Sequence, residues 1–428
     1  MLQRLLPRER WKRPGQPAHF EVTKQTMRIV KAFRFRVYPT PEQVDRLHAW
    51  QSALRFLWNL ALEQRRIGLS RCGDDKRYLT AFDQIHELTR LRAELPWLAD
   101  VPRNVCNQLL VELDRAWQRC FAKLARRPRW KRKGRDSLSF CEPHPKVWRV
   151  DGSTLRFPKL GNLRAVLHRP LEGTLKTCTL KNDAGQWFAS VVCEVDVVDP
   201  VPRSEPVVAI DRGVVNLVGD SDGRLEPSHD FYGKAMQRLA LAQRSLSRKR
   251  KGSKNREKAK ARVAILHRTV RRQREQLLHT LSAQYAKSHG VVVVENLQIG
   301  NMVKVGGGLA RGILDAGWGR FATMLDYKLR WAGGRLEYET AAYSSQTCSA
   351  CGHVDAANRV SQSVFRCTAC GHTEHADLNA PKVLKQRYEA RANRSDKPVD
   401  GTAPEAAGRS RKRVGLRVSR RPLESSAL

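Results

Sequence analysis

Two short stretches decide the fold, Val207-Val208-Ala209-Ile210-Asp211 and Val291-Val292-Val293-Val294-Glu295. Each is a continuous apolar run that ends abruptly in a carboxylate. Strands that are buried on both faces have this composition, which is typical of the centre of an α/β sheet. The stretches therefore predict central strands of an α/β domain, which we expect to cover residues 203–345 and 373–388.

The carboxylates Asp211 and Glu295 would be costly at the ends of buried strands unless something compensates for their charge. A divalent cation is one compensation, because hard oxygen ligands suit Mg²⁺ or Mn²⁺. Two such ions about 3.5–4 Å apart can activate water and stabilise the leaving oxygen of a phosphodiester. The alternative is that both acids cap their strands and face water, and the strands alone do not decide between the two.

Four cysteines form two pairs, Cys348-Ser-Ala-Cys351 and Cys367-Thr-Ala-Cys370, with fifteen residues between them. This spacing is typical of a zinc ribbon, and four thiolates give a closed tetrahedral site whose Zn²⁺ is structural. We therefore predict a ribbon over residues 346–372. Asp377 follows it closely, either as a helix N-cap or as a further metal ligand.

The N-terminal half predicts a β domain with a helical insertion. Residues 32–38 alternate aromatic and basic side chains, as a half-buried strand does, and Thr40-Pro41-Glu42-Gln43 is a helix-starting capping box. Alternating stretches between residues 147 and 198 are separated by hairpin turn signals. We expect a small β-barrel from residues 27–40 and 126–202, with a helical bundle at 41–125.

Three further segments complete the organisation. Residues 232–288 have helical spacing broken at Gly252-Ser253, which favours an antiparallel helical hairpin. Residues 1–26 lack a clear period and are interpreted as a loose N-terminal extension. Residues 389–428 are rich in Arg, Ser and Ala, and we expect a disordered basic tail.

The charge balance points to a polyanionic partner. The chain has 79 Lys and Arg against 42 Asp and Glu, a net charge of +37, and nucleic acid rewards each well-placed cation through counterion release. A merely basic soluble protein is the alternative. The candidate nucleic-acid contacts, which could equally be solvated charges or, for the tryptophan, a packed ring, are Arg34, Arg36, Arg126, Arg127, Arg129, Trp130, Lys131, Lys249, Arg250, Lys251 and Lys254.

The chain contains no apolar run of the ~18 residues that a membrane-spanning helix needs and no evident signal peptide. We therefore expect no membrane partner and an intracellular protein.

The order of these motifs resembles the TnpB family, the insertion-sequence nucleases ancestral to type V CRISPR effectors. The similarity begins near Arg28, ends near Lys385, and departs from the family pattern at Pro381 and in the N-terminal extension. The segments that carry it are Tyr38-Pro-Thr-Pro-Glu-Gln43, Arg55-Phe-Leu-Trp-Asn59, Asp211-Arg-Gly-Val-Val-Asn-Leu, Ser221-Asp222-Gly223, Gly252-Ser-Lys-Asn-Arg256, Glu295-Asn296-Leu297, Trp318-Gly319, Tyr327-Lys328, Ser344-Ser-Gln-Thr-Cys348 and Asp377-Leu-Asn379-Ala380.

The resemblance implies a RuvC-like RNase H fold with an inserted zinc ribbon and a wedge-type barrel carrying the helical bundle. It implies that Asp211, Glu295 and Asp377 bind the catalytic metal, two Mg²⁺ or Mn²⁺ ions. It further implies a guide RNA cut from the transposon end, which pairs with double-stranded target DNA beside a short adjacent motif and forms an RNA–DNA heteroduplex. A cytoplasmic location in a prokaryote, associated with the nucleoid, is also expected from this resemblance. The oligomeric state of the protein is left open by the sequence, and we favour a monomer.

Three other functions fit parts of the sequence. A compact type V CRISPR effector would use the same site with a repeat-derived RNA. A non-cleaving RNA-guided repressor would be expected to have lost one of the three acids, which are all present. A strand-joining transposase could have similar acids, but the ordered motifs and the inserted ribbon favour guided cleavage.

Overall fold

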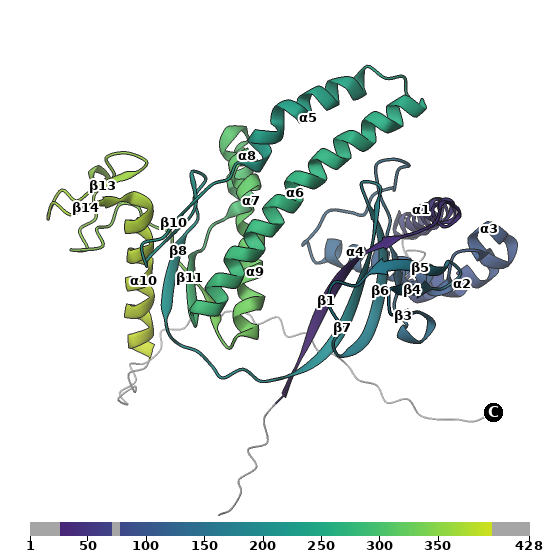
Figure 1. The fold of residues 1–428 in the computed structure, drawn as a ribbon, viewed down its shortest axis with the longest axis horizontal. Coiled ribbons are helices and arrows are strands. Elements are labelled where there is room, and N and C mark those ends of the chain that lie inside the picture. Colours follow the sequence, from purple (N-terminus) through teal and green to yellow (C-terminus); the bar gives the residue numbers. More distant parts are fainter. Residues whose placement is uncertain (1–25, 71–77, 396–428) are drawn as a thin grey trace, which may run out of the picture.

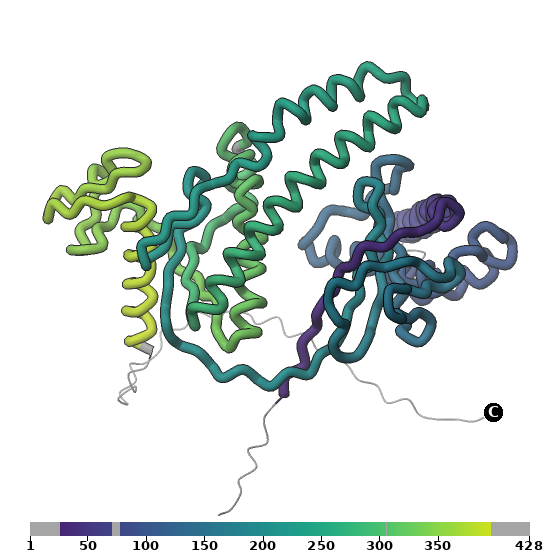
Figure 2. Tube along the Cα trace, viewed as in Figure 1, coloured from purple at the N-terminus to yellow at the C-terminus, as the bar shows by residue number. Residues whose placement is uncertain are grey.

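The computed structural model describes residues 26–70 and 78–395. They form two lobes, an N-terminal lobe of residues 26–198 and a C-terminal lobe of residues 207–395, joined by an extended segment (Figures 1 and 2). The predictions made for residues 1–25 and 396–428 concern parts of the chain outside the described residues. None of the helices in the described ranges is both long enough and apolar enough to cross a membrane.

The N-terminal lobe is a seven-stranded antiparallel sheet with helices inserted after its first strand. The sheet order is β2-β6-β7-β1-β5-β4-β3. Its elements are β1 (Thr26–Tyr38), α1 (Pro41–Ser70), α2 (Ala81–Glu94), α3 (Pro96–Ala99), α4 (Arg103–Phe121), β2 (Phe140–Glu142), a 3₁₀ turn (Pro145–Val147), β3 (Arg149–Asp151), β4 (Thr154–Phe157), β5 (Gly161–Val166), β6 (Thr174–Asp183) and β7 (Gln186–Val198).

The strand predicted at residues 32–38 lies within β1, between β7 and β5, with Phe33, Phe35 and Val37 buried. The capping box begins α1 as predicted, since the Thr40 and Gln43 side chains each accept a hydrogen bond from the other's backbone N–H. The barrel, however, is not closed: among the described residues, β2 and β3 pair on one side only and form the edges of an open sheet. Both are only three residues long, which limits what a further strand could pair with.

The C-terminal lobe is built on a five-stranded sheet of order β10-β9-β8-β11-β12. β8 and β11 are parallel neighbours, as predicted from their sequences, and β11 also runs parallel to β12. Its elements are β8 (Val207–Asp211), β9 (Asn216–Asp220), β10 (Leu225–Pro227), α5 (Phe231–Ser247), α6 (Lys254–Ser288), β11 (Val291–Glu295), α7 (Ile299–Met302), a 3₁₀ turn (Val303–Val305), α8 (Gly307–Ala316), α9 (Trp318–Trp331), β12 (Arg335–Glu339), a 3₁₀ turn (Ala356–Asn358), β13 (Val364–Arg366), β14 (Thr373–His375) and α10 (Ala376–Ser395).

Helices cover both faces of this sheet, which explains why β8 and β11 are apolar throughout. Val208 and Ile210 of β8 pack with α6 and α9, whereas Val207 and Ala209 pack with α10 on the opposite face (Figure 1). The α/β architecture with strands carrying terminal acids is therefore confirmed. α10 continues to Ser395, so residues 389–395 are helical, where the sequence predicted the start of a disordered tail.

The predicted helical hairpin is formed by α5 and α6, which run antiparallel and project from the C-terminal lobe (Figure 1). Ser253 caps α6, with its side chain accepting a hydrogen bond from the Arg256 N–H at 3.2 Å. The break at Gly252-Ser253 lies between the two helices as predicted, and Gly252 has φ +84°, a conformation that glycine adopts without strain.

Candidate active site

Three elements position the predicted acids. Asp211 ends β8, Glu295 ends β11, and Asp377 lies in the first turn of α10, on the face of the sheet that α10 covers. Parallel neighbours place their carboxyl ends at one edge of a sheet, so Asp211 and Glu295 lie together. α10 then brings in Asp377 from a distant part of the sequence.

The charges of Glu295 and Asp377 act on the carboxylate of Asp211. Burial raises the pKa of Asp211 to about 7, and repulsion by the charges of Glu295 and Asp377 adds to the rise. Burial is also the main cause that raises the pKa of Glu295, which is 8% exposed. Such a cluster of buried acids is disfavoured without a cation, and it is typical of a functional site.

Two neutral side chains orient the flanking acids. The Ser344 hydroxyl donates to Glu295 Oε1 at 2.8 Å, and the Asn216 amide donates to Asp377 Oδ2 at 2.9 Å. Sequence reasoning did not assign these roles. Both residues nevertheless lie inside segments that carry the family resemblance, after Asp211 and before Cys348, so their signal was present.

Two arginines place positive charge beside the acids. The Arg359 guanidinium, from the loop between the cysteine pairs, lies 3.9 Å from Asp377 Oδ1, and its charge opposes the rise in the pKa of Asp211 and Glu295. The buried Arg212 donates to the Glu295 carbonyl. No sequence motif marks Arg359, because only the fold brings its loop to α10.

The first turn of α10 presses closely on β9. A Cβ atom added to Gly219 would lie 2.0 Å from the Asp377 carbonyl oxygen, so this position has room only for glycine. Pro381 lies one turn later and has no N–H to donate to that carbonyl. The sequence departure at Pro381 therefore leaves α10 continuous and removes one intrahelical bond at the residue that carries the acid.

The four predicted cysteines meet. Their sulfur atoms lie within 4.8 Å of one another, with Cys348 Sγ 3.7 Å from Cys370 Sγ and Cys351 Sγ 3.6 Å from Cys367 Sγ. A tetrahedron of sulfurs about 2.3 Å from a central Zn²⁺ has edges of about 3.8 Å, so the donor set fits zinc. The Cys370 N–H is the main cause that lowers the pKa of Cys367, to about 6, whereas the pKa values of Cys348 and Cys351 are raised in the same cluster, so the fit to zinc rests on the sulfur geometry.

The zinc ribbon is coupled to the acids through Asn379, a fully buried residue of α10. Its amide donates to the Thr347 carbonyl at 2.8 Å and accepts from the Ser349 N–H at 3.0 Å. Thr347 and Ser349 flank the first ligand, Cys348. The zinc site and Asp377 are therefore held in a fixed relation at the start of α10.

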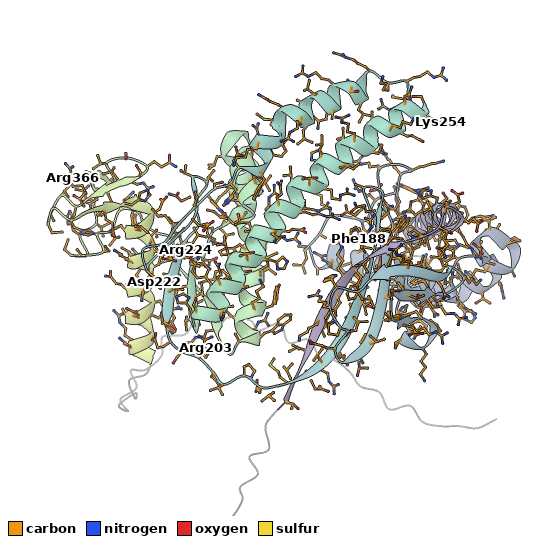
Figure 3. The ribbon with its side chains drawn as sticks, viewed as in Figure 1. Phe188, Arg203, Asp222, Arg224, Lys254 and Arg366 are labelled. Carbon is orange, nitrogen blue, oxygen red and sulfur yellow. The ribbon has the colours of Figure 1, made fainter. Side chains whose placement is uncertain are left out.

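The candidate nucleic-acid contacts fall into three groups, of which the hairpin and the 126–135 loop touch each other. Lys249, Arg250, Lys251 and Lys254 are exposed at the tip of the α5–α6 hairpin, where Figure 3 labels Lys254. The basic run from Arg126 to Arg135 lies in a loop that contacts α6, where Lys260 donates a hydrogen bond to the Gly134 carbonyl. Both groups therefore contribute to one basic surface.

Within that loop, some basic side chains are exposed and others already contact neighbouring residues of the protein. Arg126 and Arg127 are exposed, Arg129 pairs with Asp136 at 3.1 Å, and Lys131 lies 4.6 Å over the Trp58 ring. Trp130 is 39% exposed, with the Arg66 guanidinium 5.8 Å from its ring centroid.

Arg34 and Arg36 lie on the outer face of β1 and are partly engaged by the protein. Arg34 packs over Phe188 at 4.1 Å and binds Asp183 at 3.2 Å. Arg36 packs over Phe188 at 5.3 Å and over Tyr38 at 5.1 Å. Arg272 of α6 lies over the same Phe188 ring at 5.1 Å, so this face of the sheet is directed at the C-terminal lobe (Figure 3).

Three family models match successive parts of the chain. Residues 27–68 match a model described as a helix-turn-helix domain, residues 190–306 one described as "Probable transposase", and residues 318–384 one described as the Cas12f1-like TNB domain. The first of these falls on the strand β1 and the single helix α1. The second contains Asp211 and Glu295, and the third contains the four cysteines and Asp377.

A solved structure shares the fold. The chain superposes on a Cas12f1 protein, determined by cryo-electron microscopy in a complex with guide RNA and target DNA, with a TM-score of 0.52 and 14% identity. The match covers 83% of this chain and 98% of that one.

Relatives match over most of their length. The chain is 34% identical over 375 residues to "Putative RNA-guided DNA endonuclease InsQ" of Escherichia coli K12, covering 84% of this chain and 92% of that protein. It is 35% identical over 335 residues to a protein of Streptomyces pristinaespiralis described as "Putative RNA-guided DNA endonuclease". That match covers 76% of this chain and 81% of that protein. The identity and coverage of these matches show that the chain belongs to the TnpB family.

Proposed function

We propose that this protein is an RNA-guided DNA endonuclease, which hydrolyses target DNA at Asp211, Glu295 and Asp377. The observation that carries the proposal is the convergence of three carboxylates at the ends of β8 and β11 and in the first turn of α10, where burial raises the pKa of Asp211 to about 7 and the charges of Glu295 and Asp377 add to the rise. Hard oxygen donors in such a cluster fit Mg²⁺ or Mn²⁺, and the proposal includes two such ions. The bound cations would supply water activation and neutralise charge on the phosphodiester.

The protein's own residues would hold this site ready. Ser344 holds Glu295 through Oε1 and Asn216 holds Asp377 through Oδ2, and these two acids with Asp211 would be the residues that hold the cations. Arg359 adds positive charge beside Asp377, in a position suited to the negative charge that develops on a phosphodiester during hydrolysis.

The basic surfaces would hold the nucleic acids by their phosphates. The hairpin tip, the 126–135 loop and the outer face of β1 belong to three separate elements, which suits an extended and shaped RNA. Base pairing between the guide and the target strand would then read the sequence, so the protein needs no groove-reading helix. We propose that the guide derives from the end of the transposon.

The test begins with the RNA that copurifies when the protein is expressed from its native locus. An abundant species running from the element's end into flanking sequence is expected, and it supplies the guide for cleavage of a matching plasmid. The parent protein should cut in Mg²⁺, while Asp211→Ala should bind the target without cutting it.

Other outcomes lead to other functions. A repeat-derived RNA would indicate a compact CRISPR effector, and guided binding without cutting by the parent would indicate a repressor. The absence of any enriched RNA would contradict the guided mechanism.

A further inference from the structure

The turn between β12 and the zinc ribbon, residues 340–347, is bound to both acid-bearing elements. On one side Ser344 donates to Glu295 at 2.8 Å. On the other side the Thr347 carbonyl accepts from Asn379, two residues after Asp377, at 2.8 Å. The turn therefore has a fixed position relative to the acids.

Tyr343 lies in the middle of this turn, and its backbone is held firmly. Its carbonyl accepts from the N–H groups of Gln346 and Thr347, both at 3.0 Å, and from the Thr347 hydroxyl at 2.7 Å. Arg387 braces the preceding residue by donating to the Ala342 carbonyl at 2.8 Å. The next residue, Ser344, is 3% exposed.

The conformation of Tyr343 is unusual for its side chain. Its φ is +57°, in the left-handed region that glycine and asparagine adopt readily and a bulky aromatic residue rarely does. Residues held in such conformations cost free energy, and they cluster at functional sites. The geometry of the turn alone would be served better by glycine or asparagine.

The ring gains nothing from packing that would offset this cost. Tyr343 is 65% exposed, and across the described ranges neither an aromatic ring nor a guanidinium stacks on it. An exposed aromatic ring next to the serine that orients a catalytic acid can stack on a base of a nucleic acid, and stacking needs only the ring and not the tyrosine hydroxyl.

We infer that Tyr343 stacks on a nucleobase of the DNA strand that enters the active site and thereby positions the scissile phosphate over Asp211, Glu295 and Asp377. The inference rests on the proposed endonuclease function. Stacking tolerates any base, so Tyr343 would position a strand whose sequence is read elsewhere by the guide. It acts on the substrate's geometry and leaves the acids' chemistry unchanged.

The experiment compares Tyr343→Asn with Tyr343→Phe in the RNA-loaded protein. Asparagine accepts the left-handed backbone and removes the ring, whereas phenylalanine keeps the ring. In single-turnover cleavage of a matched duplex, Tyr343→Asn should be slower by roughly tenfold to a hundredfold and Tyr343→Phe should stay close to the parent. Target binding and Tm should be preserved in both.

Abasic nucleotides placed one at a time around the cut site provide a readout that a structural role would not move. With the parent, one abasic position should slow cleavage about as much as Tyr343→Asn does. With Tyr343→Asn, that same lesion should add little, because the lost ring and the lost base remove one interaction.

Effects that multiply at every position, or full activity in Tyr343→Asn, would overturn the inference while leaving guided cleavage intact. A lower Tm with loss of bound zinc would also overturn it, because the ring would then serve the fold. Failure of the parent itself to cut would count against the proposed function instead. The rate measured with Asp211→Ala defines the background against which cutting by the parent is judged.

Discussion

At the scale of single residues, the acid cluster has a consequence for pH and stability. Burial and repulsion raise the pKa of Asp211 from its usual 3.8 to about 7, so the folded protein holds a proton there that the unfolded chain has lost. Where the folded state binds more protons, stability falls as pH rises. Without bound metal, the free energy of unfolding should therefore fall as the pH rises from about 4 to about 7. The raised pKa of Glu295 acts in the same direction.

We therefore predict that, in buffer without Mg²⁺ or Mn²⁺ and with the zinc site intact, Asp211→Asn is more stable than the parent near pH 7.5 and close to it near pH 4. One pKa unit corresponds to about 1.4 kcal/mol, so a difference of at least that size is expected. Thermal unfolding across this pH range measures it. Mg²⁺ should raise the parent's Tm at the higher pH and have less effect on the variant, and parallel pH profiles would show that folding does not raise the pKa of Asp211.

Short local patterns in the sequence pointed to Asp211, Glu295 and the four cysteines, whereas Asp377 was predicted as a ligand only through the family resemblance. A buried strand ends in Asp211 and another in Glu295, and the cysteines keep the spacing of zinc knuckles. Arg359 could not be identified in this way. Its role depends on a 3.9 Å approach between a ribbon loop and α10, which no local pattern records.

At the scale of elements, the contact between β9 and α10 determines where Asp377 lies. Gly219→Ala would place a Cβ 2.0 Å from the Asp377 carbonyl, and both partners are backbone, so α10 must shift. We predict a loss of ~1–3 kcal/mol in stability and a larger loss of cleavage. Gly300→Ala is the matched control, because a Cβ there meets nothing within 4 Å. Chemical denaturation and cleavage assays of both variants check this, and equal behaviour would contradict the packing argument.

The zinc ribbon and α10 also form one unit. Removal of zinc, by a chelator or by Cys367→Ser, should release the ribbon and with it the Asn379 bonds that hold the first turn of α10. We predict loss of cleavage together with about one zinc per chain. Metal analysis and hydrogen exchange at the start of α10 measure this directly. Cys193→Ser, a buried cysteine of the N-terminal sheet, is the control that should keep its zinc, and a zinc-free protein that still cuts would separate the two sites.

The individual strands and helices were largely predictable from the sequence. Whether the strands of the N-terminal lobe close into a barrel was not. Strict alternation marks β1 and a capping box marks the start of α1. Whether seven strands close into a ring depends on the pairing of β2 and β3, which are three residues long each and lie far apart in the sheet order. Such pairing is decided by tertiary geometry, which short strands do not encode.

At the scale of the whole molecule, one acidic side chain gathers several arginines at the contact between the two lobes. Asp183, at the turn between β6 and β7, accepts two hydrogen bonds from Arg271 of α6, at 2.7 and 2.6 Å, and also binds Arg34. Beside it, the Arg268 guanidinium is buried and donates to the Asp183 and Ala184 carbonyls. The arginines at this junction would repel one another without the carboxylate.

We predict that Asp183→Ala loosens the junction between the lobes without unfolding either one. Faster hydrogen exchange in the middle of α6 and easier proteolysis of residues 199–206 should reveal it, with a cost of ~1–3 kcal/mol at the contact. Asp196→Ala removes an exposed pair with Arg28 from the same sheet and should change neither signal. Identical protection in both variants would mean that the lobes are held by other contacts.

The wide separation of the acids along the chain sets an order of events during synthesis. Asp211, Glu295 and Asp377 come from β8, β11 and α10, so the last acid emerges about 170 residues after the first, roughly 10–30 s at ordinary rates of translation. The entire N-terminal lobe is made before any of them. Under the proposed function, a nascent chain can therefore fold its basic sheet and encounter RNA before its cleavage site is complete, and a chain that stops before α10 lacks Asp377.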